Sequence, residues 1–436
     1  MKRLLVLISL SMTTLHASWL WPEKKKIAPT PQDQFSSSKN HSEKTNKNSQ
    51  AAKELLEQVA NQQDDPNSQV SAQFELGCMY FESNVIDKAR RYLNLAINQT
   101  VNSYIKTVAM IKLGILERNE KNYSTAKKYL EIVANQHDDL ELRNLALYHI
   151  GITNYIEKEY GSSKKYFDKI INESTDTSTR ALAQNELAIM YFTGEGQEKN
   201  YDTAKEYFEK AASQDQNISA KAYAQWHLGL IYFEGFGVSK NSETAKKYFE
   251  QAAAQNIDLC IKAKALFELG RLYYTTSSNN VQNYTIAEGY LLQSLDQEQL
   301  PAESKAWAQF YLGELYLVTA EKRDEAQKYL EQAAEQQDPI VSSFANFKLG
   351  TIYNDGTTQN TIKAIKYFKA VIDKNIIPEI TALAQYFLAE IYWIGKAVPK
   401  NIALAKQYLE PVCKQSFNSV ARTKAQFLLG IILREN

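Results

Sequence analysis

A Leu-Gly motif recurs along the chain, at Leu76-Gly77, Leu113-Gly114, Leu228-Gly229, Leu269-Gly270, Leu312-Gly313, Leu349-Gly350 and Leu429-Gly430. Ile150-Gly151, Leu187-Ala188 and Leu388-Ala389 fill the gaps, so that ten motifs follow one another at intervals of 37 to 43 residues. An Ala stands four residues before the Leu or Ile of every motif. Because residues four apart lie on one face of a helix, this pattern predicts ten helices that share one packing surface.

A second motif alternates with the first. It consists of a small residue, two mostly polar residues, a Tyr and a large apolar residue, as in AKKYL from Ala126 and AKKYF from Ala245. Its first copy, AKELL from Ala52, has Leu in place of Tyr. We therefore expect two helices per repeat: a helix A with the Leu-Gly motif and a helix B with this Ala-Tyr motif. The array begins with a lone helix B and ends with a lone helix A, and a lone terminal helix often serves as a cap.

Such a pattern predicts an all-α fold. A single helical hairpin cannot bury its apolar face alone, whereas stacked hairpins bury it against each other and form a superhelix with a concave surface. Gly costs about 1 kcal/mol inside a helix, so its recurrence in helix A indicates that backbones pack closely there. We expect an α-solenoid of helix-turn-helix repeats over residues 50–436.

The first residues differ in kind from the repeats. A basic start at Met1–Arg3, an apolar run at Leu4–Leu15 and a small residue at Ala17 are typical of a secretory signal peptide over residues 1–17. The apolar run is too short to span a bilayer comfortably, although an uncleaved anchor is the alternative. No Cys follows it, and no later stretch is long and apolar enough for a transmembrane helix. These features predict export to the periplasm or out of the cell.

Residues 18–49 are polar and rich in Lys, Ser, Asn and Pro. Such a segment lacks the apolar residues that would offset the entropy of ordering. We therefore expect a flexible linker between the signal peptide and the repeats.

The repeats resemble a known family. Residues 224–249, with the sequence AQWHLGLIYFEGFGVSKNSETAKKYF, are similar to the Sel-1-like repeat, a relative of the tetratricopeptide repeat. Residues 384–409 match with one turn Gly lost, and the first three repeats lack the Gly-x-Gly turn and resemble tetratricopeptide units. The resemblance covers about residues 50–434. It implies an α-solenoid that binds proteins, and it names no partner.

The paired glycines Gly235 and Gly237 recur as Gly194 and Gly196, each time between helix A and helix B. A phosphate-binding loop needs a strand before it and a fuller glycine signature, whereas here a helix precedes it. We expect these glycines to supply positive φ at a turn, and Asn200 and Asn241 to cap helix B.

Several classes of chemistry find no support in the sequence. The chain has 50 basic and 50 acidic residues, so it lacks the excess positive charge typical of nucleic-acid binding. We find no HExxH or GxSxG motif, and we expect no catalysis, metal or cofactor. His149 and His227 are expected on the outer, polar side of helix A.

The three cysteines, Cys78, Cys260 and Cys413, lie several repeats apart. Neighbouring helices pack about 8–10 Å apart, whereas a disulfide needs Cα atoms closer than about 7 Å, so we expect none within the chain. This departs from the cysteine-rich secreted members of the family. It puts in doubt any carry-over of the penicillin-binding activity associated with that branch.

In tetratricopeptide-like arrays the A helices line the concave groove, which implies a set of partner-binding positions here. These are Tyr223, His227, Glu268, Arg271, Trp307, Tyr311, Glu314, Phe344 and Lys348. Aromatic and Arg side chains contribute most to protein interfaces. The alternative is that Tyr223, Trp307 and Phe344 pack between neighbouring A helices.

A more regular aromatic stripe is expected in the core. It comprises Phe74, Tyr148, Trp226, Phe267, Phe310, Phe347, Tyr386 and Phe427.

The sequence thus predicts an exported, non-catalytic scaffold that binds a protein or peptide along its groove. Two alternatives stay open: a cell-wall or penicillin-interacting, enzyme-like repeat protein, and a secreted effector that acts on a host. The sequence leaves the partner and the oligomeric state open.

Overall fold

A computed structural model describes residues 43–62, 64–98, 103–136, 139–277, 280–319, 322–354, 358–395, 397–417 and 419–435. The expected signal peptide, residues 1–17, and most of the expected linker lie outside these ranges. Helix α2 begins at Glu43, which is inside the segment expected to be a linker.

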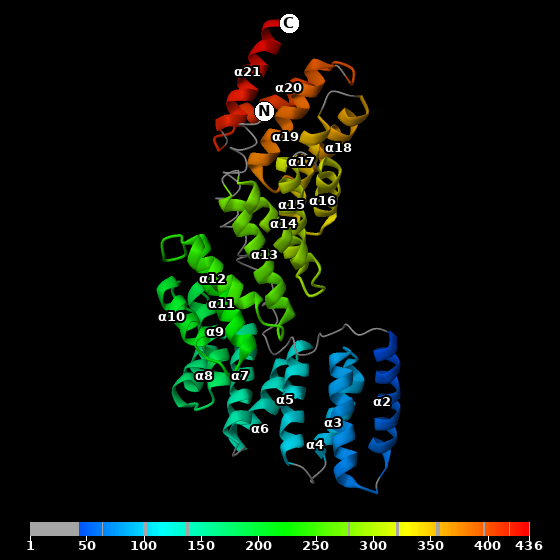
Figure 1. The fold of residues 1–436 in the computed structure, drawn as a ribbon, viewed down its shortest axis with the longest axis vertical. Helices are drawn as coiled ribbons and strands as arrows, with labels where there is room; N and C mark the ends of the chain where they lie inside the picture. The colour runs from blue at the N-terminus through cyan, green and yellow to red at the C-terminus, as the bar shows by residue number, and fades with distance from the viewer. Residues whose placement is uncertain are drawn as a thin grey trace. The chain divides into compact units, whose positions relative to one another are not determined.

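The described residues form twenty helices and no strand, so the expected all-α solenoid is confirmed. The ten A helices are α3 (Pro66–Glu82), α5 (Ser103–Asn119), α7 (Leu140–Ile156), α9 (Thr177–Thr193), α11 (Ile218–Glu234), α13 (Leu259–Thr276), α15 (Ala302–Thr319), α17 (Pro339–Tyr353), α19 (Pro378–Ile394) and α21 (Ser419–Glu435). The ten B helices are α2 (Glu43–Asn61), α4 (Ile86–Asn98), α6 (Tyr123–Gln136), α8 (Tyr160–Glu173), α10 (Tyr201–Ala212), α12 (Ser242–Ala253), α14 (Val281–Leu295), α16 (Arg323–Glu335), α18 (Thr358–Lys374) and α20 (Ile402–Lys414). Figure 1 shows the helices in this order along the chain.

The chain divides into two compact units, residues 1–261 and 262–436. Within each unit, helices that follow one another in sequence pack together, and successive A helices also touch, as α7 and α9 do in the first unit. Each helix A therefore has neighbours on two sides, as expected for a stack of hairpins.

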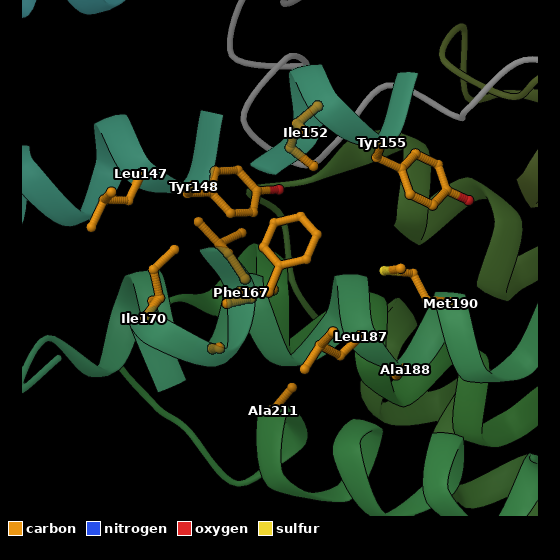
Figure 2. Close-up of a cluster of buried hydrophobic side chains, with 14 of the residues drawn as sticks. Leu147, Tyr148, Ile152, Tyr155, Phe167, Ile170, Leu187, Ala188, Met190 and Ala211 are labelled. Carbon is orange, nitrogen blue, oxygen red and sulfur yellow. The ribbon is translucent and has the colours of Figure 1, made fainter. Parts of the chain in front are cut away.

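The core of the first unit forms where three successive helices meet. Tyr148 of α7, Phe167 of α8 and Leu187 of α9 are each fully buried, and Figure 2 shows them in one cluster of apolar side chains. The rings of Tyr148 and Phe167 are 6.0 Å apart, centre to centre. Residues from three helices and two repeats thus share one core, so a single hairpin buries its apolar face only with its neighbour.

The glycine of helix A marks the place where the following helix B packs against it. A Cβ atom added at Gly229 would lie closer than 3.0 Å to the ring of Phe249, a side chain of α12. The same holds for six other glycines, each with one Leu or Phe: Gly77 with Leu93, Gly114 with Leu130, Gly151 with Phe167, Gly270 with Leu291, Gly313 with Leu330 and Gly350 with Phe368. The expected close approach is confirmed, and it explains why Gly stands at an unfavourable position inside a helix.

The turn glycines have the expected conformation. Gly235 and Gly237 have φ of 79° and 69°, and Gly194 and Gly196 have 78° and 76°. This is the left-handed region that Gly enters without steric cost. The Asn caps are also confirmed, because Asn200 accepts a hydrogen bond from the backbone N–H of Thr203 at 3.0 Å. Asn241 accepts one from Thr244 at 3.0 Å.

The aromatic stripe lies in the core only in part. Four of its residues are buried, namely Tyr148, Phe267, Phe310 and Phe347. Phe74, Trp226 and Tyr386 are half-buried. The expectation is wrong for Phe427 of α21, which is 72% exposed, because no described side chain covers that face of the helix.

Candidate partner-binding residues

The predicted site residues belong to positions that recur in every helix A. We define the A-helix row as the residues that stand two before the Gly or Ala of each Leu-Gly-type motif. In the first unit these are Glu75, Lys112, His149, Glu186 and His227. In the second unit they are Glu268, Tyr311, Lys348, Phe387 and Leu428. Four of the nine predicted partner-binding residues therefore occupy one repeated position.

Exposure differs from one member of the A-helix row to the next in the first unit. Glu75 is exposed, and Lys112 and Glu186 are half-buried. His149 and His227 are buried, at 1% and 2% exposed. The prediction thus missed the most accessible members, Glu75, Lys112 and Glu186. Their position two residues before the Gly or Ala of the motif could have identified them.

The first unit brings two of the predicted residues together. The rings of Tyr223 and His227 in α11 are 4.5 Å apart, and His227 stacks on Phe208 of α10 at 4.7 Å. Tyr223 is half-buried, and burial raises the pKa of its hydroxyl, so it is neutral at physiological pH. This cluster holds α10 against α11 and leaves part of Tyr223 accessible.

The expected outward position of the two histidines is wrong. His149 lies 3.3 Å from the guanidinium of Arg118, through Nδ1 and Nη1, and Arg118 belongs to the preceding helix A. His227 is covered by Phe208. Helical periodicity places both residues opposite the Ala-Leu face. That side is buried as well, because the preceding helix A, α5, packs on His149 and the preceding helix B, α10, packs on His227.

The second unit holds four of the predicted residues as two buried ion pairs. Arg271 contacts Glu268 within α13, with Nη2 and Oε2 2.6 Å apart, and both side chains are at most 5% exposed. Lys348 of α17 contacts Glu314 of α15, with Nζ and Oε2 2.7 Å apart, and these side chains are 3% and 7% exposed. Buried charges of this kind persist only when they are paired, so both pairs are internal to the array.

Predicted aromatic residues of the second unit also pack against each other. Trp307 lies 5.9 Å from Tyr311 and 5.8 Å from Phe344, between ring centres. All three are at most 6% exposed. Trp307 and Phe344 therefore pack between neighbouring A helices, α15 and α17, as the alternative interpretation has it. A binding role for the nine residues stays a prediction.

The described residues contain no group of three or more His, Cys, Asp or Glu side chains that could hold a metal ion. Cys78 and Cys413 carry free thiols, and burial raises the pKa of the Cys78 thiol to about 11. A reactive cysteine requires the opposite shift, since the thiolate is the nucleophile.

No helix in the described ranges is long and apolar enough to cross a bilayer.

Fold and site together define a helical repeat protein of the α-solenoid class. The Sel1 repeat matches seven segments that make up more than half of the chain: 70–101, 107–138, 181–216, 222–257, 308–338, 343–374 and 382–417. The chain belongs to the Sel1 repeat family.

Several solved structures are similar to this chain. A protective antigen of uropathogenic Escherichia coli with an SLR fold is 23% identical, over 87% of this chain and 82% of that one, with a TM-score of 0.42. A Sel1 repeat protein of Oxalobacter formigenes is 26% identical, over 63% of this chain and 98% of that one, with a TM-score of 0.43. Part of a TPR repeat-containing protein of Cytophaga hutchinsonii is 14% identical, over 62% and 98%, with a TM-score of 0.40. No curated protein matches the chain.

Proposed function

We propose that this chain is an exported scaffold that binds a partner protein or peptide along the A-helix row. The observation that carries the proposal is the repetition itself. Helix A occurs ten times in the described residues, and each copy adds one side chain to the row of its own unit. Stacked repeats of this kind form extended binding surfaces. The signal-peptide-like start at Met1–Arg3 and Leu4–Leu15 supports export.

The accessible part of the row favours a partner of mixed charge. Glu75 and Lys112 stand on successive A helices, α3 and α5, and carry opposite charges. Tyr223 stands outside the row, one turn before its member His227 in α11, and adds a half-buried aromatic side chain beside it. Complementary charges set specificity and association rate, whereas a half-buried aromatic ring adds apolar contact area. The buried members of the predicted set lie in α11, α13, α15 and α17 and offer a partner little surface.

The test is a crosslinked pull-down from the cell-envelope fraction with a charge-reversed row, Glu75→Lys with Lys112→Glu. The matched control is Glu206→Lys with Lys247→Glu, two exposed residues on the B helices α10 and α12. We expect the control to capture the same protein as the natural chain and the row variant to lose most of it. Alanine at Trp307 or Tyr311 is unsuitable here, because it would open a cavity in the core.

The other outcomes separate the alternatives. Equal capture by both variants would contradict binding along the row. Retention on purified peptidoglycan without a captured protein would favour the cell-wall function, and recovery of the chain from the culture medium would favour the secreted effector.

A further inference from the structure

The first described helix exposes a face that every other helix B buries. The Ala-Tyr motif begins with Ala or Ser and has Leu or Phe four residues later. In the nine helices from α4 to α20 both residues are fully buried, as Ala89 and Leu93 are in α4. In α2 the same positions are Ala52, which is exposed, and Leu56, which is half-buried. Leu55, at the Tyr position, is 63% exposed.

Helix α21 exposes the complementary face. At seven other A helices a Cβ atom on the motif Gly would lie closer than 3.0 Å to a Leu or Phe of the following helix B. At Gly430 of α21 the same atom would meet nothing within 4 Å. Phe427 and Leu433, three residues to either side of it, are 72% and 59% exposed, and Val420 in the first turn of α21 is 49% exposed. A capping helix has a polar outer face, so α21 lacks the character expected of a cap.

We propose that these two faces bind each other between two copies of this chain, with α2 of one copy on α21 of the next. Leu56 would fill the space above Gly430, as Leu93 does above Gly77, and Ala52 would allow the helices to approach closely. The interface would thus repeat the A–B packing that recurs within each repeat. Because two different faces are joined, the contact is head-to-tail and leads to closed rings or open chains.

The second copy is favoured as the occupant because α2 carries the required motif. Its Ala52-to-Leu56 spacing equals that of the helices that pack on the other A-helix glycines. Both faces are apolar, and burying apolar surface drives association.

The test is sedimentation velocity of the purified full chain over a hundredfold concentration range. Gly430→Gln places a side chain in the open space above α21, where its Cβ meets no described atom within 4 Å. Gly161→Gln is the matched control, since Gly161 is an exposed helical residue whose Cβ would also meet nothing within 4 Å. Ala52→Glu with Leu55→Glu blocks the opposite face on α2. Circular dichroism verifies that all variants are equally helical.

We expect the natural chain and the Gly161 variant to associate as concentration rises. Measured alone, the α21 variant and the α2 variant should each self-associate with a dissociation constant at least tenfold higher than that of the natural chain. Mixed in equal amounts, they should form a one-to-one dimer, because each keeps one intact face.

A natural chain that stays monomeric throughout would overturn the proposal, as would an α21 variant that associates like the natural chain. Dimers of the α2 variant alone would show α21 pairing with itself. A mixture of the two variants that fails to dimerise would mean that α2 and α21 do not bind each other.

Discussion

Replacing Lys348 by Met is expected to lower the free energy of unfolding by about 3–5 kcal/mol, the usual cost of breaking a buried ion pair by removing one partner. Lys348 and Glu314 are 2.7 Å apart and almost fully buried between α17 and α15. Met keeps the length and apolar stem of Lys. The loss of stability therefore comes from the charge of Glu314, which is left in the core without its partner. Urea unfolding followed by circular dichroism measures it.

Two variants make this result interpretable. Lys247→Met, on the exposed side of α12, should change stability by less than about 0.5 kcal/mol, as surface substitutions usually do. Glu314→Gln with Lys348→Met should lose less than Lys348→Met alone, since no buried charge remains. A Lys348→Met variant as stable as the natural chain would mean that the pair is open to water. The A-helix row would then be accessible in the second unit as well.

The second large effect is expected at the contact between helix B and the A-helix glycine. Phe249 is fully buried, and its nearest ring atom would lie 2.4 Å from a Cβ added at Gly229. Phe249→Ala should destabilise the chain by about 3–5 kcal/mol, because it removes buried apolar surface and leaves a cavity over a residue with no side chain to fill it. Thermal unfolding by calorimetry provides the measurement.

Phe417→Ala is the matched control, since Phe417 is 53% exposed, and it should cost well under half as much. Similar losses for Phe249 and Phe417 would contradict the packing described for α11 and α12.

Much of the fold could be predicted from the sequence because its signals are local. The Ala-to-Leu spacing of four residues identifies each helix A, and the paired glycines Gly235 and Gly237 identify a turn that needs positive φ. Both depend on the backbone of one hairpin. The repetition of a pattern along the chain then shows that the hairpins must stack.

The candidate site could be predicted less well because it depends on how tightly the hairpins stack. Periodicity placed His149 and His227 opposite the Ala-Leu face, but it carries no information on whether a neighbouring helix covers that side. The Glu314–Lys348 pair joins helices that are not consecutive in sequence. Phe427 has the spacing of a core residue and is exposed, because burial requires a neighbouring helix and not only a pattern.

The most direct test of the proposed scaffold function is site-specific photo-crosslinking in the native cell. A photoreactive amino acid replaces Glu75, on the accessible part of the A-helix row, or Glu206, on the exposed side of a helix B. A protein-binding row predicts discrete crosslinked products from position 75 and few from position 206. Products from position 206 alone, or from neither position, would contradict binding along the A helices.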